Sequence, residues 1–536
     1  MELIPKRESE VEVLRLQQKL FRWSENEIYE FDRMYNLIYH PLVLSQAWHR
    51  LARNKGSRTP GVDGVTVKIV KEEFGVSEWL SDIQERLRSK DFDPNLVLRR
   101  WIPKNSDPSR LRPLGIPTLE SRLVQMAMKL ILEPIFEAHF KSCSTGFRPH
   151  RGPITAAAMV RLYMRPNSGY NWVVEADLRG CFDNIDHSRL LYCVKQRVGD
   201  KRVINLIAAF LKAGVMDNGH VYYPLTGTPQ GGILSPLLTN IYLDQLDEWY
   251  HSRYHALSGY QKGKLVASGQ PILRLIRYAD DFVIMVKGTK EQALEVLADL
   301  RTFVQDTLKM ELAEEKSGVH HLKEGFAFLG YLFRRGRRQR SLELGTILLP
   351  TNEAVIRFRR KVKELTSRST TYQSLEVVIG NINRVINGWG NYFCYGWISA
   401  LFCKLDHYVH MRVGRWLRKK HKGRTWKWLL RRYLRSDLTG YRCWSWHGKY
   451  ITSLSRTFKG RRLLSQTENI RTPFNQASPE QVDLRLFATG ATKLRRMELS
   501  LRRRRAGGEP GEGKLSRRVR RAVVGNGARK RNRALC

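Results

Sequence analysis

Asp280 and Asp281 are adjacent carboxylates between two short apolar runs of the segment Arg274–Val286. The runs are rich in β-forming residues, and a polar pair is readily left in a turn, which predicts a β-hairpin with both acids at its tip. Such a tip can hold metal ions. An ordinary solvated turn is the alternative, because an Asp side chain often bonds its own backbone.

A third carboxylate favours the metal site. Asp177 ends the strand-like run Trp172–Asp177, and the residues after it, with Gly180 and Asn184, suit an irregular turn. The separation from Asp280 leaves room for a helical crossover, so we expect the two strands to lie side by side with their acids converging. Mg²⁺ accepts one or two carboxylates together with waters and substrate phosphates. Two such ions, about 3.5–4 Å apart, would activate a 3′-hydroxyl and neutralise a leaving pyrophosphate, which predicts nucleotidyl transfer.

The elements that must position these acids alternate between strand and helix over residues 171–333. One helix is predicted to begin at Ser235 and Pro236, with the serine hydroxyl as its cap, and another to span Glu291–Leu308. We expect both on one side of a small antiparallel sheet, in the ferredoxin-like arrangement. Residues 251–270 are interpreted as a surface loop. The predicted core faces comprise Leu238, Ile241, Tyr242 and Leu246 in the first helix and Leu294, Leu297, Leu300, Val304 and Leu308 in the second.

Helices are also predicted on both sides of this region. Residues 1–50 are amphipathic and charged, and a helix near Leu119–Phe140 has Leu123, Ala127, Leu130 and Ile131 on one face. Residues 334–350 are interpreted as a basic connector into a helical region at 351–440. Tryptophans there are expected to be mostly core residues, with binding assigned to the basic faces beside them. These tryptophans are Trp389, Trp397, Trp416, Trp426 and Trp428.

Several motifs occur in the order of a known protein family. Asp177 with Phe182, then Thr228–Gly232, then Tyr278–Asp281 resemble the successive motifs of reverse transcriptases. Longer phrases are similar to those of group II intron-encoded maturases, over residues 30–450. These phrases are Asn54–Gly56 with Gly61–Gly64, Arg112–Pro117, Gly146–Pro149, Gly227–Pro236, Phe328–Tyr331 and Gly388–Tyr392.

The resemblance implies an α+β fold of the right-hand polymerase type. Residues 1–50 would be an N-terminal helical extension, 51–170 the fingers, 171–333 a ferredoxin-like palm, 351–440 an α-helical thumb or maturase domain, and 441–536 a basic C-terminal DNA- or RNA-binding region. It also implies an RNA-directed DNA polymerase that binds its group II intron RNA, assists splicing and copies the intron into DNA during mobility. The implied partners are an RNA template with a DNA primer, target DNA and deoxynucleoside triphosphates.

The same resemblance assigns roles to single residues. Asp177 and Asp280 would be direct ligands of two Mg²⁺ ions, with Asp281 as the second acid of the pair. Phe182 would exclude a ribose 2′-hydroxyl by a steric clash, or else be an ordinary core residue. The remaining implied contacts are Lys104 and Arg112 on the triphosphate, unless they are solvated cations, Gln230 and Gly231 near the new base pair, and Lys316 near the pyrophosphate.

Composition favours a polyanionic partner. The 536-residue chain has 93 Lys and Arg against 51 Asp and Glu, a net charge of +42. A membrane surface is the competing explanation, but no stretch approaches the roughly 18 apolar residues of a spanning helix, and no signal peptide is expected. Seven cysteines without Cys-x-x-Cys spacing are typical of free thiols in a reducing cytoplasm, bacterial or organellar, where the chain would be associated with RNA or the nucleoid.

The resemblance fades after Tyr450. Many relatives carry a Cys/His-rich nuclease module here, whereas residues 451–536 hold only Cys536 and no histidine, so no such module is expected and a primer would come from elsewhere. The arginine-rich tail from residue 494 is predicted to be disordered when free, and either binds nucleic acid or is a solvated terminus. Two alternative functions are not excluded by the sequence. They are a non-catalytic RNA-binding splicing factor and a host-recruited reverse transcriptase used in defence or repair. The intact acids and Phe182 argue against the former.

Overall fold

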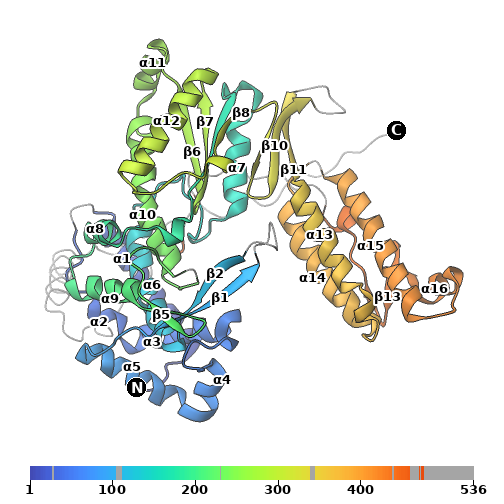
Figure 1. Ribbon diagram of the computed structural model, residues 1–536, viewed down its shortest axis with the longest axis horizontal. Coiled ribbons are helices and arrows are strands. Elements are labelled where there is room, and N and C mark those ends of the chain that lie inside the picture. Colours follow the sequence, from blue (N-terminus) through green and yellow to red (C-terminus); the bar gives the residue numbers. More distant parts are fainter. Residues whose placement is uncertain are drawn as a thin grey trace, which may run out of the picture. The chain divides into compact units, whose positions relative to one another are not determined.

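The chain is a mixed α+β protein in which a region of helices and strands is followed by a helical one (Figure 1). The predicted arginine-rich tail lies outside the described residues. No described helix has the length and apolar character needed to cross a membrane. The six cysteines in the described ranges are free thiols, as predicted. The computed structural model describes residues 1–26, 29–103, 111–229, 231–337, 344–396, 398–437, 440–458, 470 and 472–475.

A four-stranded antiparallel sheet, called the central sheet below, carries the predicted acids. Its strand order is β6-β7-β3-β8. The predicted hairpin is confirmed, since β6 and β7 pair antiparallel and enclose a two-residue turn of Ala279 and Asp280. Strand β3 pairs with β7, as expected for neighbouring strands, and the pairing is antiparallel. The strands are β3 (Trp172–Asp177), β6 (Ile272–Tyr278), β7 (Asp281–Lys287) and β8 (Gly318–His321).

Helices α10 (Ser235–Tyr250) and α12 (Lys290–Asp306) complete a βαββαβ order with this sheet, which is the predicted ferredoxin-like arrangement. The predicted serine cap of α10 is wrong. Leu234 is the N-cap, and the Ser235 hydroxyl instead donates to the Pro229 carbonyl at 2.9 Å, because the chain turns at Pro229 and brings this oxygen to the first helical residue. The predicted core face of α10 is confirmed, with Leu238, Ile241, Tyr242 and Leu246 all buried.

The predicted core face of α12 is wrong at its start. Ala293 and Val296 are buried, whereas Leu294 is 48% exposed and Leu297 is only partly buried. The Thr289 hydroxyl accepts from the Gln292 amide and fixes where the helix begins, and the helix then packs its smaller residues against β3 and β8. The later predicted core residues Leu300, Val304 and Leu308 are buried.

The segment 251–270 lies at the surface as predicted, but most of it is helical, so its interpretation as a loop is wrong. The π-helical turn η5 (His251–His255) continues α10, and α11 (Gly259–Ala267) follows. A capping box explains why a glycine-containing segment starts a helix here. The Ser258 hydroxyl accepts from the Gln261 amide at 3.2 Å, and the Gln261 side chain accepts from the Ser258 amide at 2.8 Å.

The segment 334–350 is also more ordered than the predicted basic connector, in its described part. It belongs to a three-stranded sheet of order β11-β10-β9, with β9 (Phe326–Phe328), β10 (Tyr331–Arg337) and β11 (Leu344–Pro350). Burial alternates along β10, and Arg335 takes an inward position. Its guanidinium donates to the carbonyls of Tyr170 at 2.7 Å and Met164 at 3.2 Å, so an arginine can be buried in a strand.

The N-terminal part combines helices with a second four-stranded sheet. Helices α1 (Lys6–Ser24), α3 (Pro41–Arg53) and α6 (Leu119–Glu137) pack against one another, and the predicted face of α6 is buried. The sheet has the order β2-β1-β4-β5, with β1 and β2 antiparallel and β1 and β4 parallel. Its strands are β1 (Val97–Pro103), β2 (Leu111–Ile116), β4 (Val215–Asp217) and β5 (His220–Tyr222). The other helices before the central sheet's hairpin are α2 (Tyr35–Ile38), α4 (Val67–Ile69), α5 (Val76–Ser89), α7 (Pro153–Tyr163), α8 (His187–Lys195) and α9 (Lys201–Lys212).

The predicted helical region at 351–440 is observed and has its own apolar core. Trp416 is buried in that core, and Trp389, Trp426 and Trp428 pack against it, so the core interpretation of these tryptophans is confirmed; Trp397 lies outside the described residues. The helices are α13 (Asn352–Leu365), α14 (Leu375–Phe393), α15 (Ser399–Lys420) and α16 (Trp426–Tyr433), followed by β12 (Leu434–Ser436), β13 (Arg442–Trp446), β14 (Lys449–Tyr450) and α17 (Leu454–Thr457).

Candidate active site

Three carboxylates meet at one edge of the central sheet. Asp177 is the last residue of β3 and Asp281 the first of β7, and the strand register places them opposite each other. Asp280 lies in the turn before β7, directly after Ala279, whose φ of 57° is in the left-handed region. The structure thus brings together the three acids that the sequence singled out.

Lys316 joins this group from η6 (Glu314–Lys316) and forms an ion pair with the Asp177 carboxylate. The hydrogen bond to Asp177, with the charges of Asp177 and Asp281, raises the pKa of Lys316. One predicted substrate-binding lysine therefore lies beside the acids. It supplies a single positive charge against three carboxylates.

The electrostatics of the acids reflect this imbalance. Burial, with the negative charge of Asp177, raises the pKa of Asp280. Burial and then the charges of Asp280 and Asp177 raise the pKa of Asp281 to about 7. The Asp281 residue as a whole still has exposed surface, although its carboxyl group is surrounded by protein atoms. Crowded carboxylates with raised pKa values favour the binding of an additional cation.

The donor set suits Mg²⁺, which prefers carboxylate and phosphate oxygens. Within the described ranges, no group of three or more His, Cys, Asp or Glu residues forms a ready-made metal cage. Mg²⁺ does not require one, because it commonly takes one or two carboxylates and completes its shell with waters and substrate phosphates. The residues therefore fit a metal ion that binds together with a phosphate-bearing substrate.

A buried ion pair holds the acid-bearing turn. Arg277 and Asp247 of α10 are both 0% exposed, and Arg277 Nε donates to Asp247 Oδ1 at 2.8 Å. The same guanidinium donates to the Ala279 carbonyl at 3.0 Å and to Asn240 Oδ1 at 3.1 Å. The left-handed residue before Asp280 is therefore held by Arg277 of β6, which is itself held by Asp247 and Asn240 of α10.

Gly146 and Phe147 connect the turn to Phe182. The Gly146 carbonyl accepts from Asn240 Nδ2 at 2.8 Å, and a Cβ at Gly146 would lie 2.2 Å from the backbone nitrogen that follows Tyr278. Only a glycine permits so close an approach. The Phe147 ring packs against both Phe182 and Tyr278, with ring centroids 6.4 Å apart in each case. Phe182 is thus linked to the acid-bearing turn through one intervening ring.

The other predicted substrate contacts belong to the second sheet or lie outside the described residues. Arg112 is exposed on β2. Gly231, with a φ of 115°, approaches β2 so closely that a Cβ would lie 2.4 Å from the Gly115 carbonyl oxygen. A glycine is therefore required by the packing on β2, and the place of Gly231 near the new base pair stays a prediction. Lys104 and Gln230 are not among the described residues.

Sequence reasoning missed Arg277, Asp247 and Asn240. Arg277 itself was a usable signal, because a charged residue within an apolar strand needs a buried partner. Asn240 and Asp247 are seven residues apart, which is about two helical turns and places them on one face of α10. Nothing in the local sequence connects Gly146 and Phe147 with the turn, because that contact is made only in the folded chain.

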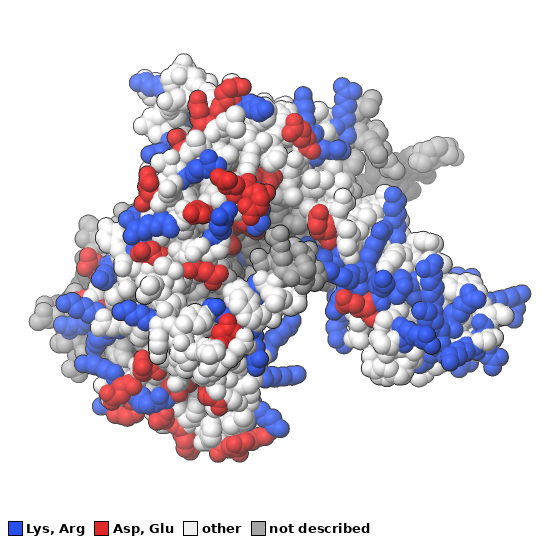
Figure 2. All heavy atoms as spheres, in the orientation of Figure 1, with Lys and Arg blue, Asp and Glu red and all other residues white. Residues whose placement is uncertain are grey.

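The helical region carries a dense basic surface. Asp406 is the sole acidic residue between Ser399 and Tyr433, and Figure 2 shows Lys and Arg gathered over α13–α16. The guanidinium groups of Arg424 and Arg432 lie 5.2 and 5.5 Å from the Trp428 ring. Such cation–π contacts hold the positive charges in place at the surface.

Comparison with known proteins assigns a family to each of two regions of the chain. Residues 102–333 match the family described as reverse transcriptase (RNA-dependent DNA polymerase), and residues 355–434 match the group II intron, maturase-specific domain. The chain therefore contains a reverse transcriptase domain followed by a maturase domain.

Individual relatives define the family more narrowly. Protein YkfC of Escherichia coli (strain K12) is 36% identical over 345 residues, which cover 61% of this chain and 89% of the relative. The group II intron-encoded protein LtrA of Lactococcus lactis subsp. cremoris is 30% identical over 481 residues, which cover 76% of this chain and 78% of the relative. The chain belongs to the family of group II intron-encoded reverse transcriptases and maturases.

Proposed function

We propose that Asp177, Asp280 and Asp281 bind two Mg²⁺ ions in the synthesis of DNA on an RNA template. The supporting observation is the convergence of three carboxylates on one sheet edge, two of them with raised pKa values. Bound Mg²⁺ would activate the primer 3′-hydroxyl and neutralise charge on the leaving pyrophosphate. Lys316 would orient Asp177 and offer a positive charge to the departing phosphates.

We propose further that the parts of a right-hand polymerase surround this site. Residues 171–333 would form the palm, residues 51–170 the fingers and residues 351–440 the thumb. Phe182 would lie under the sugar of the incoming nucleotide and clash with a 2′-hydroxyl. Arg112 would bind the triphosphate, since its planar donors can grip phosphate in pairs. Lys104 would assist Arg112, and Gln230 with Gly231 would line the new base pair.

Primer extension by the Asp280→Ala variant tests the catalytic assignment. We expect DNA synthesis on an RNA template to be lost, while binding of the primer–template duplex is nearly unchanged, because Asp280 would act on the metal and not on the nucleic acid backbone. The matched control is Asp299→Ala, which removes an exposed carboxylate from α12 and should leave synthesis intact. Substantial synthesis by the Asp280→Ala enzyme would reject the assignment.

We also infer that the basic surface of α13–α16 binds the intron RNA, and that the protein thereby assists splicing and copies the intron into DNA during mobility. The match of residues 355–434 to the maturase-specific domain and the excess of Lys and Arg support this inference. Each phosphate contact that is lost should lower both the affinity and its dependence on salt.

The test is RNA binding at several salt concentrations by a triple alanine variant of exposed α15 residues. We expect a weaker complex and a shallower salt dependence than in a control that removes three exposed cations elsewhere. Equal losses in both would contradict a specific RNA surface, and no preference for intron RNA in the parent would favour a host-recruited reverse transcriptase. The tested residues are Arg415, Arg418 and Lys419, and the control residues are Lys68, Lys71 and Arg88.

A further inference from the structure

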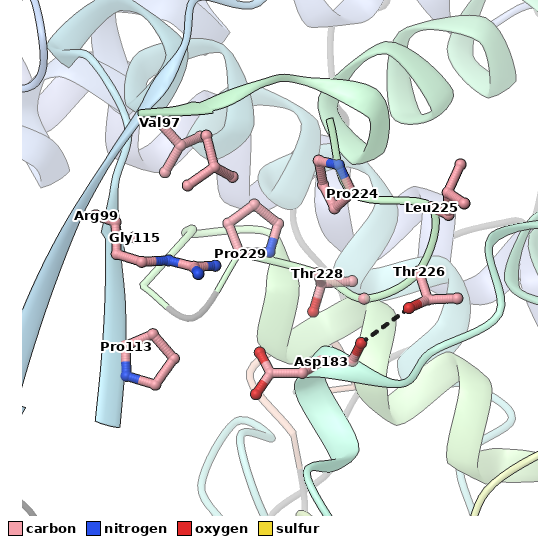
Figure 3. A pocket seen from close by; sticks show the side chains of 12 residues that line it. Val97, Arg99, Pro113, Gly115, Asp183, Pro224, Leu225, Thr226, Thr228 and Pro229 are labelled. Atoms are coloured by element: carbon pink, nitrogen blue, oxygen red, sulfur yellow. Dashed lines mark hydrogen bonds between the residues drawn. The ribbon is translucent and has the colours of Figure 1, made fainter. Parts of the chain in front are cut away.

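A cavity of about 330 Å³ lies where β1, β2 and β4 meet the segment 224–229 (Figure 3). The cavity is at the lower end of the range of about 300–1,000 Å³ that is usual for ligand pockets. Most of its wall is apolar, and a few polar side chains converge on it, which is the usual composition of a binding site. These polar side chains are Arg99, Asp183, Thr226 and Thr228.

One polar group of the wall lacks a partner. Thr228 is 3% exposed, and its Oγ1 forms no hydrogen bond within the described residues. The neighbouring Thr226 hydroxyl, in contrast, donates to the Asp183 carbonyl at 3.1 Å, which is the dashed contact in Figure 3. A buried hydroxyl without a partner costs free energy. The Thr228 hydroxyl is therefore available to a ligand that enters the cavity.

The strand register shows which face of the β1–β2 hairpin the cavity uses. Arg99 pairs with Gly115, and both line the cavity, whereas Arg112 pairs with Ile102. Successive side chains of a strand point to opposite faces, so Arg112 is on the face away from the cavity. If Arg112 binds the triphosphate of the incoming nucleotide, the cavity is not the site of that triphosphate.

Two exposed aromatic residues that lie close in the chain to the cavity wall resemble a surface for stacking bases. Trp101 is 46% exposed and follows Arg99 on the same face of β1, and Tyr223, which precedes the segment 224–229, is 69% exposed. The Arg99 guanidinium lies 4.8 Å from the Tyr222 ring and 5.7 Å from the Trp101 ring. Exposed aromatic rings combined with arginine are what proteins use to hold single-stranded nucleic acid.

The cavity also lies beside Phe182, which is the chain neighbour of the lining residue Asp183. The Thr228 amide donates to the Phe182 carbonyl at 2.7 Å, and Asp183 contributes to the cavity wall. We propose that the cavity receives an unpaired nucleobase of the RNA template, the one next to be copied after the templating base. The Thr228 hydroxyl and the Asp183 carboxylate would meet the edge of this base, and Arg99 with Trp101 would cover its face. This inference rests on the proposed polymerase function.

Single-nucleotide incorporation on two RNA templates tests the inference. Both templates carry one nucleotide beyond the templating position, and in one of them that nucleotide is abasic. For the parent enzyme we expect kcat/KM to be at least about fivefold higher with the intact template, because stacking of one base supplies a factor of this size or more. In Thr228→Val and Arg99→Ala, the ratio between the two templates should fall towards one.

Two control variants test whether the change in the ratio is specific to groups that line the cavity. Thr228→Ser keeps the hydroxyl and should keep the ratio of the parent. Arg100→Ala removes the same charge from the neighbouring position of β1, on the opposite face. This variant should also keep the ratio of the parent. Equal rates of the parent enzyme on intact and abasic templates would overturn the inference whatever the variants do. A parent enzyme that incorporates nothing on either template would instead reject the proposed polymerase function.

Discussion

The Asp247→Ala substitution should strongly destabilise the hairpin that carries the acids. Asp247 and Arg277 are both fully buried. Burial alone would lower the pKa of Arg277, but the charge and hydrogen bonds of Asp247 outweigh it and raise that pKa, so the guanidinium stays charged. Without Asp247, its remaining acceptors are the oxygens of Asn240 and Ala279. Leaving one buried charge without its partner costs about 3–5 kcal/mol.

Hydrogen exchange of the peptides that cover β6 and β7 measures this loss locally. A decrease of about 3–5 kcal/mol in the free energy of opening corresponds to exchange that is faster by roughly two to four orders of magnitude. Replacing both partners, as in Arg277→Met with Asp247→Leu, should recover most of the protection, since an apolar pair of similar volume is often neutral or stabilising. In the control variant Lys68→Ala, hydrogen exchange of the peptides that cover β6 and β7 should hardly change.

The Lys68 control breaks an ion pair with Glu72 whose side chains are 78% and 61% exposed. Exposed pairs of this kind contribute about 0–1 kcal/mol. Acceleration of less than about tenfold in Asp247→Ala would refute the reasoning, because about 1.4 kcal/mol corresponds to a factor of ten. A double variant that exchanges as fast as the single one would refute it as well.

Three further predictions concern the same site. Gly146→Ala should abolish primer extension because the new Cβ would lie 2.2 Å from the Ala279 nitrogen, and an active variant would show that the turn can move. Since the pKa of Asp281 is raised to about 7, the folded Mg²⁺-free protein holds a proton that the unfolded chain has lost, so its thermal stability should fall as pH rises from about 4 through 7. Asp281→Asn should flatten that slope, and an unchanged slope would contradict the assignment. Phe182→Ala should lower the ratio of kcat/KM for deoxynucleotides over ribonucleotides, and a ratio equal to that of the parent would contradict the steric role.

The strand ends that carry the acids were predictable because short-range patterns determine them. Runs of β-forming residues define β3 and the β6–β7 hairpin, and the carboxylates at their ends converge once β3 pairs antiparallel with β7. The antiparallel pairing of β3 with β7 was not predictable from spacing, since a long connection permits either direction.

Other parts of the fold depend on contacts that a local pattern does not contain. Leu294 fits a helical apolar stripe, yet α12 turns Ala293 and Val296 towards the sheet instead. The capping box of Ser258 and Gln261 could have been read from the sequence, but the glycines around it favoured a loop. The support of the turn by Asn240 joins segments that are far apart in the chain, and only the fold reveals it.

The contact between Gly146, Asn240 and Arg277 has a consequence for engineering. The acid-bearing turn cannot be transferred as a hairpin alone. Its left-handed residue, Ala279, is held by Arg277 of the same hairpin, and the charge of Arg277 is balanced by Asp247 of α10. The same helix, through Asn240, also binds the backbone that precedes Phe147. Transplanting this active site into another scaffold would therefore require three separate pieces of chain to be moved together, and the smallest transferable unit is the turn with its helix and the Gly146 segment.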